Sequence, residues 1–263
     1  MTVPLQHARR GTAWRGLALT AVATLVMPVA ALAQGAEAEP LPEPGTALEP
    51  GRYVSSAVGP SIAFRAEAGW IVGPSGNGPI FTLERAEQPG TVLSVTRFDG
   101  DVFLDSCDPS SLTVVEATVP RLLEVIGGNP YLNPGPPAQT AVDGYEGLWM
   151  DVATPAYEEC DLPWLLLWAL PMAEGGEFVQ VADQQSRFIV LDVDGDVIVV
   201  AIESFPGVPF GGLLEASLEL VDSMRIEPGE YVPPEPSASP IPGPSDEPAA
   251  ASPAVEPSPS PAA

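Results

Sequence analysis

The feature that most constrains this chain is the segment Phe188–Ile202, which reads FIVLDVDGDVIVVAI. Its two arms, Phe188–Val193 and Val197–Ile202, are rich in β-branched and other apolar residues and flank Asp194-Gly195. Asp-Gly tolerates the positive φ angles of a type I′ turn, so the segment predicts a β-hairpin. Because both arms are apolar almost throughout, we expect the hairpin to lie inside a sheet with both faces covered.

The rest of the folded part predicts further strands and two helices. Ile80–Arg85 and Val92–Phe98 read as a strand pair joined by a turn. Thr118–Ile126 and Gly211–Met224 carry apolar residues at helical spacing. Most strands follow one another through short turns, which favours an antiparallel β-sheet packed with helices, the α+β class.

Several motifs of residues 51–227 occur in a characteristic order. Phe64 is followed by Gly69-Trp70, a strand pair, a mid-chain helix, and a last hairpin that runs into a helix ending Val221-Asp222-Ser223. This order resembles the PsbP-like fold, and with the two cysteines it also resembles uncharacterised secreted or envelope-attached bacterial domains. The resemblance implies an antiparallel sheet between helices and a non-enzymatic or unknown role, and it transfers no functional residue.

The two ends of the chain differ in composition from the middle. Residues 1–33 are typical of a signal peptide, with Arg9, Arg10 and Arg15 before an apolar run that ends in Ala31-Leu32-Ala33. Residues 34–50, rich in Ala, Glu and Pro, are expected to form a disordered spacer. Residues 51–227 are then the globular domain. Residues 228–263, rich in Pro, Ala and Ser, are expected to form a disordered tail.

The balance of charge excludes several partners and chemistries. The chain has 35 acidic and 10 basic residues, all of the latter arginine, so nucleic acid and anionic membrane surfaces would repel it. Cleavage after Ala33 would remove His7, the single histidine, and leave no membrane span in the mature chain. Without His or Lys, it cannot build a Ser-His-Asp triad, a His-ligated zinc site or a Schiff base. We expect no cofactor.

The two cysteines, Cys107 and Cys160, lie in polar loops. A signal peptide directs the chain to an oxidising compartment, where an even number of cysteines favours pairing. The sequence therefore predicts a Cys107–Cys160 disulfide. A metal site is the weaker interpretation, because two thiolates would need carboxylates to complete the ligand shell.

Three groups of residues are candidates for a site. Glu158, Glu159 and Asp161 could supply the paired carboxylates of a glycoside hydrolase, or they could be a solvated charge run. Trp164 and Trp168, four residues apart, could share a face as an aromatic platform for a ligand, or they could be core. The acids of Asp192–Asp196 suggest calcium, but their spacing does not match a Ca²⁺ loop, and we favour a hairpin turn without a metal.

No residue set in the sequence supports an activity. We therefore expect a secreted, non-catalytic binding or interaction module of the cell envelope, with an envelope protein or a glycan as its partner. The alternative is a carboxylate-dependent hydrolase of glycans that uses the acids near Cys160 and the two tryptophans.

Overall fold

The hairpin predicted from Phe188–Ile202 forms the centre of the structure, a computed structural model that describes residues 37–74, 79–157, 160–171 and 176–229. Its strands are β14 (Gln185–Val193) and β15 (Asp196–Ser204). Asp194 and Gly195 have φ angles of 54° and 97°, as a type I′ turn requires. The prediction of a hairpin at this place is confirmed.

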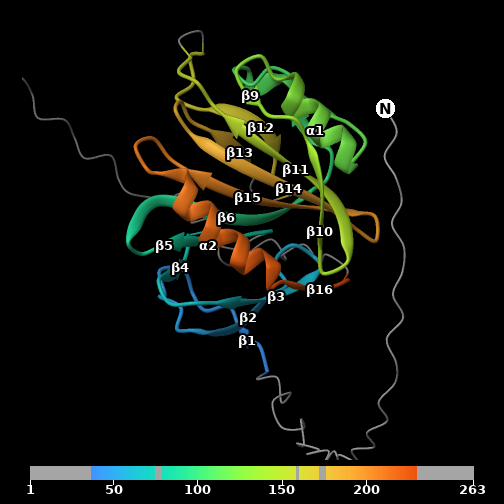
Figure 1. Cartoon of the computed structure of the whole chain (residues 1–263). Coiled ribbons are helices and arrows are strands. Elements are labelled where there is room, and N and C mark those ends of the chain that lie inside the picture. The colour runs from blue at the N-terminus through green and yellow to red at the C-terminus, as the bar shows by residue number, and fades with distance from the viewer. Residues whose placement is uncertain (1–36, 75–78, 158–159, 172–175, 230–263) are drawn as a thin grey trace, which may run out of the picture. The chain divides into compact units, whose positions relative to one another are not determined.

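The hairpin lies in the middle of an eight-stranded antiparallel sheet, which we call the central sheet (Figure 1). The strand order is β10-β11-β14-β15-β6-β5-β4, and the short β9 pairs with the far end of β11. The other strands of this sheet are β4 (Trp70–Val72), β5 (Ile80–Arg85), β6 (Gln88–Phe98), β9 (Asn133–Pro134), β10 (Ala138–Val142) and β11 (Tyr145–Ala153).

The two faces of β14 and β15 belong to two separate hydrophobic clusters. Ile189 and Val200 belong to the first cluster, and Phe188 and Val199 to the second. Successive residues of a strand point to opposite faces, so apolar residues at every position require cover on both sides. The expectation that both faces are covered is confirmed.

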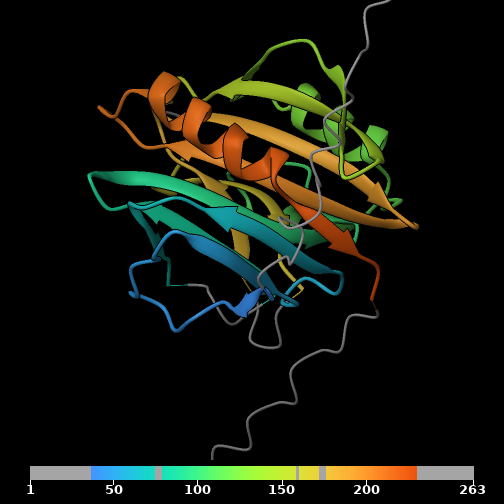
Figure 2. The same ribbon diagram turned by 60° about the horizontal axis from the view of Figure 1, so that its bottom comes forward.

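A second sheet and a helix cover the first face. Sheet A has the order β1-β2-β3-β16, and α2 runs directly into β16 (Figure 2). Leu213 and Leu220 of α2 are buried in the first cluster together with Phe64 of β3. The elements of this layer are β1 (Glu39–Pro40), β2 (Gly51–Ser55), β3 (Ser61–Ala66), α2 (Phe210–Asp222) and β16 (Arg225–Glu227).

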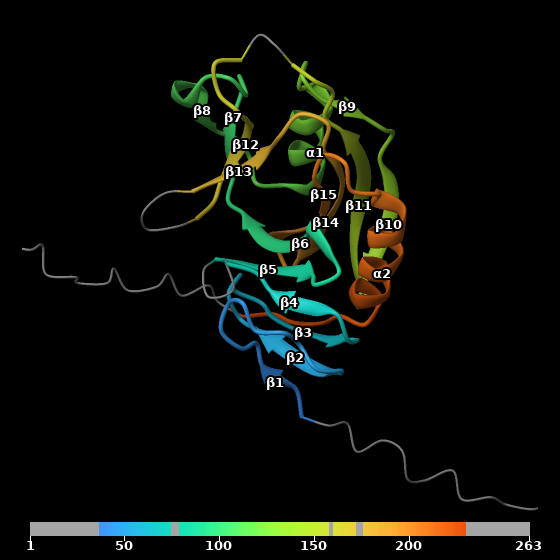
Figure 3. The same cartoon turned by 90° about the vertical axis from the view of Figure 1, so that its left-hand side faces the viewer.

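A third sheet and a helix cover the opposite face. Sheet C has the order β13-β12-β7-β8 and lies with α1 on the side of the central sheet away from sheet A (Figure 3). Leu122 and Ile126 of α1 are buried in the second cluster beside Trp168. The elements of this layer are β7 (Asp101–Phe103), a 3₁₀ turn (Pro109–Ser111), β8 (Leu112–Val114), α1 (Val119–Gly128), β12 (Leu165–Ala169) and β13 (Glu177–Gln180).

The prediction of an α+β fold is wrong. Within the described residues, sixteen strands stand against two α-helices, and most of the strand pairs are antiparallel. Both predicted helices are present, but each covers only part of one face of the central sheet. Strands of sheets A and C provide the rest of the cover, so this is a β-rich fold built from three mostly antiparallel sheets.

The folded part begins upstream of Gly51, so the structure corrects the expectation of a disordered spacer over residues 34–50 where it describes them. Glu39–Pro40 pairs in parallel with β2, and Leu48 is buried in the first cluster. The amide of Leu48 donates to Trp70 O at 2.8 Å, and Thr46 O accepts from the amide of Val72 at 2.9 Å. This segment covers the outer edge of β4, a long-range contact that composition does not reveal.

Cys107 and Cys160 form a disulfide, as predicted. The bridge joins the loop after β7 to the segment before β12, with the two Cα atoms 5.2 Å apart. Both cysteines pack on the second cluster, so the bridge fastens sheet C beside α1. In the part of the chain that the structure describes, no helix is long and apolar enough to cross a bilayer.

A chain that begins at Gly51 should be less stable than one that begins at Glu37. It loses the burial of Leu48 and the main-chain bonds to β4, a loss of about 3 kcal/mol that corresponds to a fall of roughly 6–12 °C in melting temperature. Differential scanning calorimetry of the two chains measures the difference. Equal melting temperatures would show that residues 37–50 contribute no packing.

Changing Cys107→Ser should lower the free energy of unfolding, because the bridge closes a loop over a sequence separation of 53 residues. Chain entropy sets an upper bound of about 4 kcal/mol on this effect. Urea unfolding measures it, and Cys160 should become reactive to a thiol reagent. The double change Cys107→Ser and Cys160→Ser is the control and should match the single change. Two titratable thiols in the native exported protein would contradict the bridge.

Candidate functional site

A groove of about 870 Å³ lies on the same face of the central sheet as α1, on the part of that face that the helix does not cover. The helix begins at Val119, so the ends of four strands, β10, β11, β14 and β15, extend beyond it. The burial of β10 alternates accordingly, with Gln139 and Ala141 exposed and Val142 buried on the other face. The groove is lined by Ala117, Thr118, Val119, Pro120, Gln139, Thr140, Ala141, Glu146, Gly147, Leu148, Asp192, Gly195 and Val197.

The charged residues that line the groove are acidic. Glu146 and Asp192 lie on its floor, and no arginine is among the lining residues. Asp192 Oδ1 accepts a hydrogen bond from the amide of Gly195 at 2.8 Å, which holds the hairpin turn. No described basic group forms an ion pair with Glu146. Together these carboxylates give the groove a negative potential that favours cationic groups.

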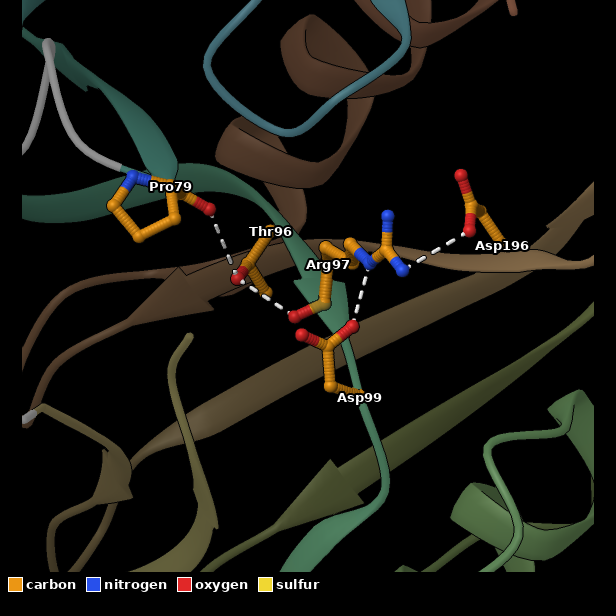
Figure 4. A network of polar contacts seen from close by, with 5 residues as sticks. All are labelled: Pro79, Thr96, Arg97, Asp99 and Asp196. Atoms are coloured by element: carbon orange, nitrogen blue, oxygen red, sulfur yellow. Dashed lines mark hydrogen bonds and ion pairs between the residues drawn. The ribbon is translucent and has the colours of Figure 1, made fainter. Parts of the chain in front are cut away.

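Arg97 lies in the strand beside β15, but it does not neutralise the groove. It pairs in register with Ile198, whose side chain belongs to the cluster under α2, so Arg97 lies on the opposite face of the sheet. Its guanidinium contacts Asp99 at 2.5 Å and Asp196 at 3.2 Å, as Figure 4 shows. The positive charge is therefore already paired with two carboxylates.

The start of α1 forms one wall of the groove and presents a main-chain donor. Thr118 occupies the N-cap position, but its side chain makes no capping hydrogen bond. Leu122 is the first residue of the helix whose amide bonds back, to Thr118 O at 3.1 Å. The amide of Val119, which lines the groove, has no partner among the described residues. The wall therefore offers a main-chain donor to a ligand, while the floor offers carboxylates.

A buried polar cluster lies elsewhere on the same face, between the central sheet and sheet C. Glu203 of β15 is 6% exposed, and its Oε1 accepts hydrogen bonds from Gln180 Nε2 at 2.8 Å and Gln184 Nε2 at 2.6 Å. Gln180 Oε1 in turn accepts from the hydroxyl groups of Ser186 at 2.9 Å and Thr154 at 3.2 Å. The cluster joins β13 of sheet C to three strands or strand ends of the central sheet.

Burial raises the pKa of Glu203 to about 8, because an ionised carboxylate loses its hydration there. The hydrogen bonds from Gln184 and Gln180 act in the opposite direction, but desolvation is the larger effect. Glu203 is therefore mostly protonated at neutral pH. Since its carboxyl group is sealed from solvent, we assign it a role in joining the layers and not in catalysis.

A smaller crevice of about 230 Å³ lies beside the C-terminal half of α2. Arg85 lies over the ring of Trp70, with the guanidinium carbon 5.0 Å from the ring centroid. Glu219 of α2 also lines it, as do Arg65 and Glu67, which form an ion pair at 3.1 Å. Because both signs of charge are present beside the negative end of a helix, the crevice selects no charged ligand.

The structure describes one of the three predicted carboxylates. Glu158 and Glu159 lie outside the described residues, so the predicted carboxylate pair stays a prediction, and Asp161 is exposed beside the disulfide. Among the described residues, no group of three or more His, Cys, Asp or Glu side chains is arranged to hold a metal ion. The acids of Asp192–Asp196 form the hairpin turn that we favoured, with Asp192 as its local acceptor.

The predicted tryptophan platform is not present, because the two indoles lie in different environments. Trp164 precedes β12 and is 42% exposed, whereas Trp168 is fully buried. The register of β12 shifts between Leu166 and Trp168, so a spacing of four residues does not place them on one face. Trp168 stacks on Phe178 with ring centroids 4.1 Å apart, so it belongs to the core.

Large exposed apolar residues occur in sheet C and in the segments next to its strands. Within the described residues these are Leu104, Leu112, Val114 and Trp164. Leu112 and Val114 are alternate residues of β8, the last strand of that sheet, and therefore lie on one face. This edge is a second surface on which a partner can bury apolar area.

The groove and the cluster around Glu203 were both missed in the sequence analysis. The groove depends on where α1 begins relative to strands that are distant in sequence, and no local pattern encodes that offset. For Glu203 one signal is present, since it follows the apolar run Val197–Ile202 in a strand expected to be covered on both faces. A charged residue that extends such a strand can be expected to be buried and protonated.

Comparison with known proteins gives little. No family model and no curated protein matches the chain. Among solved structures, a crystal structure from Bacteroides thetaiotaomicron is similar over 62% of this chain and 44% of that one, with 7% sequence identity and a TM-score of 0.35. The chain thus spans less than half the length of that protein. A likeness this weak carries no argument, and the resemblance of individual motifs to the PsbP-like fold stays a prediction.

Replacing Glu203→Gln should remove a pH dependence of stability. The native state holds the Glu203 proton up to a pH of about 8, whereas the unfolded chain releases it near the ordinary glutamate pKa of 4.5. The free energy of unfolding therefore falls as pH rises between these two values, by about 1.4 kcal/mol for each unit of pKa shift. Gln imitates the protonated acid, so the variant should gain stability over the wild type as pH rises from 5 to 8.

Urea unfolding at several pH values measures this difference. Glu177→Gln removes an exposed carboxylate of sheet C and serves as the matched control. Its stability should stay parallel to that of the wild type across the same range. If the Glu203→Gln curve were also parallel, the carboxyl group of Glu203 would not be protonated in the folded state.

Proposed function

We propose that the mature chain is a secreted, non-catalytic binding module of the cell envelope, and that the groove beyond the start of α1 is its ligand site. The observation that carries this proposal is the groove itself, a concave surface of about 870 Å³ on a rigid sheet. It combines an apolar floor around Leu148 and Val197 with a few polar groups, which is typical of ligand sites.

The chemistry of the groove supports binding more than catalysis. Its titratable lining residues, Glu146 and Asp192, are exposed to solvent, whereas catalytic acids and bases are usually desolvated within a cleft. Glu203, whose pKa burial raises to about 8, lies in the core and not in the groove. Among the described residues, no arrangement of carboxylates favours the alternative of a glycan hydrolase.

The location outside the cytoplasm is supported by two features. The disulfide between Cys107 and Cys160 persists in oxidising compartments. The first 33 residues have the pattern of a signal peptide, although they lie outside the described residues. An envelope location brings the module into contact with glycans and with exported proteins, which are the two proposed classes of partner.

Blocking the groove should abolish binding to envelope material. Ala141→Trp places a large ring on its floor, whereas Ala86→Trp makes the same chemical change in an exposed turn on the far side of the central sheet. Co-sedimentation with the insoluble glycan fraction and capture of solubilised envelope proteins measure binding. We expect the Ala141→Trp protein to lose it and the Ala86→Trp protein to keep it.

Three results would contradict the proposal. Equal binding by both tryptophan variants would place the ligand outside the groove. Loss of binding in Trp164→Ala alone would assign the ligand site to the exposed apolar residues of sheet C. Turnover in a panel of ester, peptide and glycoside substrates, lost on changing Asp161→Asn, would favour the hydrolase.

A further inference from the structure

We propose that the groove takes an extended peptide segment of a partner protein, which joins the free edge of β10 as a further strand and directs a basic side chain to Glu146. This inference rests on the proposed function, because it names the ligand class of the same groove. It is carried by three features of β10 and its neighbours: an unpaired edge, the direction of its main-chain groups, and the charge beside it.

One edge strand of the central sheet is covered by another segment of the chain, and the other is not. At one edge, the segment around Thr46 bonds to Val72 of β4 and so covers that strand. At the other edge, β10 pairs only with β11, and no described segment bonds to its outer side (Figure 1). An edge strand without cover is a template for pairing with another chain, and added strands are a common mode of peptide recognition.

The hairpin of β10 and β11 decides which groups point outward. Its two-residue turn has φ angles of 51° at Asp143 and 89° at Gly144, so Val142 and Tyr145 close it as a hydrogen-bonded pair. Pairs alternate along an antiparallel ladder. The N–H and C=O groups of residues 139 and 141 therefore point away from β11, toward solvent.

The same two residues also line the groove. The side chains of Gln139 and Ala141 are exposed on its floor, while their main-chain groups face the open edge. A strand added beside β10 would make four main-chain hydrogen bonds to them and lay its alternate side chains over the groove. Affinity then comes from the main chain, and selectivity comes from the floor.

The floor selects for a basic side chain. Ala141 is the register partner of Glu146, so a residue opposite Ala141 in the added strand lies two inter-strand spacings, about 9.5 Å, from the backbone of Glu146. The side chain of an arginine in the added strand and that of Glu146 are together long enough to meet across this distance. The small side chain of Ala141, which lies between them, does not block the contact. Asp192, further along the floor, adds to the negative potential.

Charge argues against a second copy of this chain as the occupant. Pairing of two β10 edges would bring two acidic grooves together, in a chain with 35 acidic and 10 basic residues. Like charges at an interface oppose association. A neutral glycan has no main-chain groups to match the edge. The occupant that fits both the edge and the floor is a basic peptide in extended conformation.

Fluorescence anisotropy with synthetic peptides tests this inference on the intact mature protein. The probe is a nine-residue peptide of alternating threonine and valine with a central arginine. The comparison peptides carry glutamine in place of arginine, or N-methyl groups on the alternate residues that face β10. We expect the N-methylated peptide not to bind, and the glutamine peptide to bind about two- to fivefold more weakly, the range of an exposed ion pair.

Protein variants assign the contacts to particular residues. Glu146→Gln should weaken binding of the arginine peptide by the same factor and leave binding of the glutamine peptide unchanged. Glu177→Gln, which removes a distant exposed acid, should change the affinity for neither peptide. Ala141→Pro removes an outward donor without breaking the ladder to β11, and Ala141→Val keeps that donor. We expect only the proline variant to lose binding, and equal melting temperatures of the two variants show that both are folded.

The outcomes separate this inference from the proposed function. If Ala141→Trp abolishes binding to envelope material but no peptide binds, the groove is a ligand site and the peptide inference is wrong. If the N-methylated peptide binds like the parent, or if Glu146→Gln weakens both peptides equally, edge pairing or charge selection is excluded. Dimerisation of the protein through β10, seen by sedimentation and lost in Ala141→Pro, would identify a second copy as the occupant instead.

Discussion

The structure depends on the burial of one hairpin on both of its faces. The arms of β14 and β15 are apolar at nearly every position, and each alternate set faces a different cluster. Leaving either face in water would forfeit about 25 cal/mol for each Å² of apolar surface. The chain must therefore supply two covering layers, and it does so with sheet A and α2 on one side and sheet C and α1 on the other (Figure 3).

The two covers are not equally complete, and this difference produces the candidate site. On the side of sheet A and α2, the cover of the central sheet reaches the turn of the hairpin formed by β10 and β11, where Val142 is buried in the first cluster. On the other side α1 begins only at Val119, and the ends of four strands stay open. The consequence is a groove floor of paired strands beside an uncovered edge strand. Strands that are already paired in the free protein would limit the entropy lost on association.

A buried polar cluster joins the central sheet to sheet C. Apolar packing alone would not fix the position of one sheet on the other. Glu203 accepts from two glutamines, one at the end of β13 and one just before β14, so both elements are held against β15. Leaving these amides unpaired in the core would cost free energy, so the hydrogen bonds favour one relative position of sheet C and the central sheet. The disulfide at Cys160 holds the same sheet at another point.

The sequence by itself determined the central hairpin with its turn at Asp194-Gly195, the disulfide, and the presence of both helices. The hairpin and the helices follow from local signals, namely apolar runs on both sides of an Asp-Gly turn and apolar residues at helical spacing. The disulfide follows from the even number of cysteines and the signal peptide. It did not determine the fold class, because the strands that cover the central sheet find partners far away in sequence, as β16 does with β3. Even the buried face of α2 was set by its contacts, since Leu213 and Ser217 are buried while Leu214 and Leu218 are only partly buried. The groove, the free edge of β10 and the pKa of Glu203 were decided only by the tertiary structure, because each depends on which distant elements pack together and on where that packing stops.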